Sequence, residues 1–157
     1  MTEIEANDRI EIRLDFPRPT VVAEPRIFAD ESSLSIRYRT SDETVAIIRF
    51  PHCSYVVFGA PNDEALDGHP LAKRGLKYYT VHEIRNSSLI QELERRNSIH
   101  PRHNRDSYIK YKRHYIFTFQ DSTLECVVNE SERWAPTVKV FDTEEEADRV
   151  WPHCKNA

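Results

Sequence analysis

The residues best suited to acid–base chemistry lie in one short segment, PNDEALDGHPLAKRG, at positions 61–75, which also holds two of the chain's three glycines. A proline directly follows His69 and biases it toward an extended conformation, so the ring can be held near Asp63 or Glu64 as an oriented base. The sequence therefore predicts an ordered loop at the mouth of a pocket, with His69, Asp63 and Glu64 as catalytic candidates and Asn62 as a ligand-binding one. The alternative is an Asx-turn loop whose carboxylates cap nearby backbone amides.

A second segment, residues 95–114, has the composition of an anion site. It contains seven Lys or Arg, a single acid and two interleaved tyrosines. Arginine grips phosphate or carboxylate through paired bonds, and tyrosine can stack on a ring. We therefore expect a turn that brings Arg102, His103 and Arg105 to one side, with Tyr108 beside them. The alternative is a solvated basic loop with surface ion pairs of little energetic value.

Other patterns in the chain point away from metal, thiol and dinucleotide chemistry. His100 and His103 have a metal-compatible spacing, but cations flank them and no cysteine is near in sequence; we expect no metal and no cofactor. Two of the three cysteines, Cys53 and Cys126, fall in expected strands, and we expect all three to be free thiols. No P-loop, dinucleotide fingerprint or serine-nucleophile motif is present,.

Composition places the chain among globular proteins. Its 157 residues are 39% hydrophobic and 31% charged, with a mean hydropathy of −0.66. We expect one domain over residues 1–157, with 1–9 frayed, in the cytoplasm, because no apolar stretch is long enough for a membrane span or a signal core. The net charge is −4, yet the segment 73–113 carries eleven Lys or Arg against four Asp or Glu. This asymmetry suggests either an anionic partner for the middle of the chain or a charge distribution that folding intermixes.

Hydrophobic periodicity predicts a mainly β protein. Alternating patterns indicate half-buried strands, and continuous apolar runs at 44–50 and 53–58 indicate central strands covered on both faces. Helices are expected after Asn86–Ser88 and after Thr143. The fold class is therefore α+β, a single domain with a mainly antiparallel curved sheet of about seven or eight strands and two short helices. The further expected strands lie at 10–16, 34–39, 76–85, 113–119, 123–128 and 137–141. The residues expected to be largely buried are Ile47, Val56, Phe58, Ile116, Phe117, Leu124 and Trp151.

These patterns support two functional hypotheses. The first is a small binding or interaction module for an anionic ligand, such as a phosphate-bearing one, or for an acidic protein surface. Nucleic acid is a further candidate ligand, although the sequence matches no nucleic-acid-binding motif. The second is a hydrolase or transferase acting on a phosphate-bearing substrate, with His69 or His103 as acid or base. The two hypotheses differ in whether the 61–75 loop and the basic segment converge in space.

Overall fold

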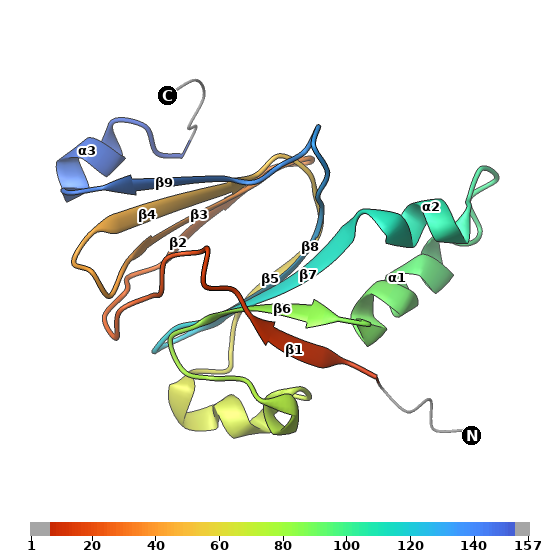
Figure 1. Cartoon of the computed structure of the whole chain (residues 1–157), viewed down its shortest axis with the longest axis horizontal. Coiled ribbons are helices and arrows are strands. Elements are labelled where there is room, and N and C mark those ends of the chain that lie inside the picture. Colours follow the sequence, from red (N-terminus) through yellow and green to blue (C-terminus); the bar gives the residue numbers. More distant parts are fainter. Residues whose placement is uncertain (1–6, 153–157) are drawn as a thin grey trace.

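Nine strands form two antiparallel sheets in the computed structural model, which describes residues 7–152 (Figure 1). The α+β, mainly antiparallel prediction is confirmed, although the strands divide between two sheets. The five-stranded sheet has the order β1(Arg9–Ile12), β6(Val81–Arg85), β7(Lys112–Thr118), β8(Thr123–Asn129), β5(Cys53–Gly59). The four-stranded sheet has the order β2(Arg26–Ala29), β3(Leu34–Arg39), β4(Val45–Phe50), β9(Thr137–Phe141).

The main core lies between the two sheets. One face of β3 and β4 contributes residues such as Ile36, Tyr38 and Phe50, which join Phe117 and Leu124 of the other sheet in a single buried cluster. Side chains alternate between the two faces of a strand, so one face of each sheet is committed to this cluster. Of the residues expected in the core, Ile47, Ile116, Phe117 and Leu124 are buried.

Strand β5 corrects the sequence expectation. It is an edge strand, not a central one, because β8 is its single partner in the sheet. Val56 and Phe58 pair with the buried Cys126 and Leu124, yet they are 36% and 44% exposed. Trp151, also expected to be buried, is half-buried. Continuous apolar runs therefore marked a strand correctly but not its place in the sheet.

Short helices cover the outer faces of both sheets. Helix α3(Glu144–Asp148) begins at Thr143, whose side chain accepts from the Glu146 amide as expected, and it packs on Val45 and Ile47 of β4. The buried Arg37 of β3 holds this helix through ion pairs with Glu144 and Asp148.

Helix α1(Ser88–Asn97) confirms the first expected helix. Its N-cap is Ser87, which accepts from the Ile90 amide. A second helix, α2(Arg105–Lys110), was not expected, because six residues are too few to show helical periodicity,. It begins at Asn104, whose side chain accepts from the Ser107 amide. The two helices lie together at one end of the five-stranded sheet (Figure 1).

Two 3-10 helices, η1(Asp63–Gly68) and η2(Ala72–Arg74), replace the loop expected over most of 61–75. The expected strand at 76–85 begins at Val81. Arg9 already belongs to β1, so the frayed prediction does not hold there, and residues 1–6 and Cys154 lie outside the described residues. Within residues 7–152, no helix is long and apolar enough to cross a membrane.

Candidate functional site

The segment at 61–75 lines a small acidic hollow. Asn62, Asp63 and Glu64 border a cavity of about 320 Å³ together with Tyr79 and Asp121. The Asn62 side chain accepts from the Ala65 amide and so starts η1. The Tyr79 hydroxyl donates to Asp63 over 2.6 Å, and this bond raises the pKa of Tyr79. The expectation of an ordered segment beside a pocket therefore holds for these three residues.

His69 does not join them. Its Nδ1 accepts from the Leu71 amide and its Nε2 contacts Glu125 at 3.1 Å, with 8% of the side chain exposed. Both ring nitrogens are thus engaged away from Asp63 and Glu64. The predicted constellation of His69 with those two carboxylates is not assembled, because the ring contacts Glu125 of β8 instead.

Glu125 instead connects two histidines on the outer face of the five-stranded sheet. Its second oxygen lies 2.8 Å from His114 Nε2, and His114 Nδ1 lies 2.7 Å from the Ser87 hydroxyl. Burial raises the pKa of Glu125, but the hydrogen bonds from His114 and His69 outweigh burial and lower it to about 2. Sequence reasoning missed this network, since its members lie at separate places in the chain.

The basic segment at 95–114 borders a larger cavity that we call the aromatic hollow. It has a volume of about 580 Å³, and none of the described residues lining it is Asp or Glu. Three of the predicted ligand-binding residues line this cavity: Arg102 and His103 from the 98–104 turn, and Tyr108 from α2. The lining residues used below are Arg102, His103, Tyr108, Tyr111, Lys112, Asn129 and Trp134.

Lys112 is the most unusual of these residues. It is only 9% exposed, its Nζ lies 4.6 Å from the centre of the Tyr108 ring, and burial lowers its pKa. Among residues 7–152 no carboxylate forms an ion pair with it. A charge taken out of water is normally paired or bound to a ligand, so Lys112 is a candidate for contact with an anion.

Unsatisfied polar atoms lie close to Lys112. Asn129, its cross-strand neighbour, has a buried Oδ1 without a hydrogen-bond partner, and so does Nδ1 of His52. The His52 ring lies 5.2 Å from that of Trp134, and proximity to Lys112 adds to burial in lowering the pKa of His52. Asn129 borders the aromatic hollow, whereas His52 is not one of its lining residues. Because buried polar atoms are rarely left unpaired, the Asn129 amide is the group of this pair that can meet a polar ligand.

The side chains of His103 and Arg102, the other two predicted residues of this hollow, differ in whether they are hydrogen-bonded to the rest of the protein. His103 is held by Glu94 at Nε2 and by Asn97 at Nδ1, both at 2.8 Å. The Arg102 guanidinium has no bond to any described residue, and its exposed side chain borders the cavity. Arg102 is therefore available to a ligand, whereas His103 serves as a fixed part of the wall.

Arg105 lies elsewhere, which corrects the expected grouping with Arg102 and His103. It borders a separate cavity of about 390 Å³ that we call the cationic hollow. Helix α2 divides the two cavities, because Arg105 and Ile109 lie one turn apart on the face toward the cationic hollow, whereas Tyr108 borders the aromatic hollow,. Lys112 borders both cavities. The charged residues lining the cationic hollow are Arg9, Glu83, Arg85, Arg105, Lys110, Lys112 and Arg113.

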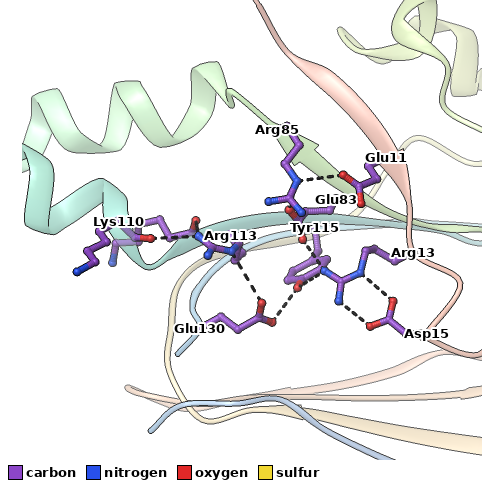
Figure 2. A network of polar contacts seen from close by, with 10 residues as sticks. Glu11, Arg13, Asp15, Glu83, Arg85, Lys110, Arg113, Tyr115 and Glu130 are labelled. Atoms are coloured by element: carbon purple, nitrogen blue, oxygen red, sulfur yellow. Dashed lines mark hydrogen bonds and ion pairs between the residues drawn. The ribbon is translucent and has the colours of Figure 1, made fainter. Parts of the chain in front are cut away.

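Figure 2 shows how part of this charge is balanced. Glu83, the one acid lining the cationic hollow, lies between Arg13 and Arg85. Arg113 donates to two backbone carbonyls and lies 3.9 Å from Glu130. Arg9, Arg105 and Lys110 have no carboxylate partner within residues 7–152, so the hollow keeps an excess of positive charge.

Comparison of the chain with protein-family models, with curated proteins and with solved structures found no match. Within residues 7–152 no cluster of three or more His, Cys, Asp or Glu could hold a metal ion. Interpretation of the site therefore depends on its geometry.

Proposed function

We propose that the protein binds a small anionic ligand with a planar ring in the aromatic hollow. The observation that carries this proposal is Lys112, a nearly buried lysine with no carboxylate partner in the described chain, next to a cavity without acidic lining residues. An anion that neutralises Lys112 recovers part of the free energy lost by burying it.

The other lining residues fit the two halves of such a ligand. Arg102 can hold a phosphate or carboxylate through two parallel bonds, and Asn129 offers an amide for a neighbouring polar group. Tyr108, Tyr111 and Trp134 supply the faces on which a base or other ring can stack. The volume of about 580 Å³ lies in the range typical of small-molecule sites. A mononucleotide combines an anionic phosphate, further polar groups and a planar ring in a molecule of suitable size, and is therefore the probe of choice.

The free thiols of Cys53 and Cys126 support a cytoplasmic setting for this binding, since thiols persist in reducing compartments.

The alternative function, a hydrolase or transferase acting on a phosphate-bearing substrate, would need His103 or His69 as acid or base. Both rings already use their two nitrogens in bonds to the protein. We therefore favour binding over catalysis in the aromatic hollow.

A thermal-shift and calorimetric comparison tests the proposal. The probes are AMP, adenosine, ribose 5-phosphate and inorganic phosphate. We expect AMP to stabilise the protein most, because it alone supplies both ring and anion. Arg102→Ala should weaken AMP binding by about 10-fold or more, the loss expected for a charge-assisted contact. Arg105→Ala is the matched control and should leave AMP binding unchanged, because Arg105 borders the other cavity. Absence of stabilisation by all four probes, or equal effects of the two arginine variants, would refute this site.

A further inference from the structure

The wall of the cationic hollow contains a serine hydroxyl that is hydrogen-bonded to a histidine. Ser87 borders this cavity, and behind it the chain of hydrogen bonds runs from its hydroxyl to His114 and from His114 to Glu125. From this geometry we infer that Ser87 is an activated nucleophile that cleaves small carboxylic esters bearing a negative charge. The inference does not depend on what binds in the aromatic hollow.

The direction of the hydrogen bonds follows from their partners. An ionised Glu125 can only accept, so His114 must present Nε2–H to it. A neutral His114 then has an acceptor at Nδ1, toward which the Ser87 hydroxyl donates over 2.7 Å. The Ile90 amide donates to the same hydroxyl oxygen at 3.1 Å, which leaves the hydroxyl proton free for the ring. This is the arrangement in which a histidine can remove a proton from serine.

Ser87, His114 and Glu125 are held in place by three different parts of the fold. Strand β6 ends at Arg85, and Asn86 adopts a left-handed backbone with φ of 53°, so the chain turns sharply into α1 with Ser87 at the turn. Ser87 is only 4% exposed and borders the cationic hollow at this turn, so a substrate would reach it from that cavity. His114 comes from the adjacent strand β7 and Glu125 from β8. Both are held by sheet pairing, which makes the geometry rigid.

The charge of the cavity defines the substrate class. Arg9, Arg105 and Lys110 border the hollow without carboxylate partners in the described chain, so an anionic group on the substrate is attracted and oriented there. His69 occupies the other oxygen of Glu125. It acts, with Glu125, as a positioning residue for His114 rather than as a catalytic one.

The reaction balances without a further reagent except water. The Ser87 oxygen bonds to the ester carbonyl carbon while His114 Nδ1 takes the hydroxyl proton. The carbon–oxygen bond to the alcohol then breaks, and the alcohol leaves with that proton. Water adds to the acyl-serine with His114 again as base, which releases the carboxylic acid and restores both residues.

A fluorophosphonate probe with peptide mapping by mass spectrometry tests the nucleophile directly. We expect covalent modification of Ser87 in the folded wild type, and loss of it in Ser87→Gly, a substitution well tolerated at helix N-caps. Ser98→Ala, at the other end of α1, is the matched control and should be labelled like wild type. His114→Gln should slow labelling by about 100-fold or more. An unmodified Ser87 in the folded wild type overturns the inference, even if a variant fails to fold.

The substrate class is tested with two esters of similar size, the negatively charged 4-nitrophenyl succinate and the neutral 4-nitrophenyl butyrate. We expect the charged ester to be hydrolysed with at least about 10-fold higher kcat/KM, and Arg105→Ala to remove that preference by raising KM for the charged ester alone. Glu125→Gln should lower kcat with little change in KM, as expected for a positioning residue. Equal hydrolysis of both esters, or none above the uncatalysed rate, contradicts the inference.

Discussion

Replacing Lys112 by methionine should change stability and ligand binding in opposite directions. Lys112 is 9% exposed, and its ammonium rests on the Tyr108 ring without a carboxylate partner within residues 7–152. Methionine has a similar length and no charge, so Lys112→Met removes the desolvation cost while keeping the packing. We therefore expect the variant to be more stable than wild type in the absence of ligand and to bind AMP more weakly.

The magnitude follows from two opposing contributions. Burying an unpaired polar group costs on the order of 1–3 kcal/mol, and contact with an aromatic face returns about 0.5–2 kcal/mol. The net gain for the methionine variant is about 1 kcal/mol, which raises Tm by about 2–4 °C in a chain of this length. Loss of one contact to a charged ligand costs about 1.5–3 kcal/mol, or roughly 10- to 150-fold in Kd.

The gain should also depend on pH. Burial lowers the pKa of Lys112 below its usual value of 10.5. As pH rises toward that value, the folded state releases the proton before the unfolded state does, so wild-type stability increases. The advantage of Lys112→Met should therefore be full at pH 7 and shrink as pH approaches 10.5.

Urea denaturation of both proteins at pH 7 and pH 10, with AMP calorimetry at pH 7, measures these effects. Lys73→Met is the matched control, because Lys73 is an exposed lysine that borders none of the three cavities, and the substitution should change neither quantity appreciably. A methionine variant at position 112 that is less stable than wild type at pH 7, with unchanged AMP affinity, would show that the reasoning about this site is wrong.

Three further outcomes are expected. The pKa of Glu125 is lowered from 4.5 to about 2, so the stability that its ionised form contributes should be fully present above pH 4.5 and lost as pH falls toward 2. With a discount for partial exposure, this contribution is about 1–3 kcal/mol. The stability of Glu125→Gln should therefore depend less on pH over that range, as acid unfolding monitored by circular dichroism would show. Burial raises the pKa of the Cys126 thiol far above its usual range, so a maleimide should modify Cys126 at pH 8 only after the protein unfolds, as peptide mapping would reveal. Phe117→Ala should cost about 3–5 kcal/mol by urea denaturation, since Phe117 is fully buried,. Phe58→Ala, at an edge position 44% exposed, should cost less than half as much, and equal losses would contradict the edge assignment.

Local patterns in the sequence determined which segments become strands and helices. The strand at 34–39, the hairpin around 120–122 and the Thr143 cap all reappear in the structure. The half-buried character predicted for that strand is wrong, because Ser35 and Arg37 are buried as well as Ile36. Each of these features depends on side chains a few residues apart. The backbone repeat, two residues in a strand and 3.6 in a helix, decides which of these side chains lie on the same face. Short elements such as α2 and η1 escaped this reasoning because they span too few residues for a repeat to be visible.

The place of each strand in the sheets was not determined locally. Strands β4 and β5 share the same apolar character, yet Ile47 is 1% exposed and Phe58 44% exposed. Burial of a strand depends on which neighbours pair with it and what covers the sheet, and both are decided by contacts between distant parts of the chain.

The candidate sites also differ in how far local sequence determined them. Composition alone identified Arg102, His103 and Tyr108, which meet in the aromatic hollow because they lie within one turn and a short helix. The same composition could not separate Arg105 from them, since the direction of each side chain depends on α2.

Tertiary structure alone brought Ser87, His114 and Glu125 together. They are 27 and 11 residues apart along the chain, and their contact depends on the antiparallel register of β6, β7 and β8. Because strand register is fixed by the packing of whole sheets rather than by neighbouring residues, no local pattern in the sequence could have assembled this network.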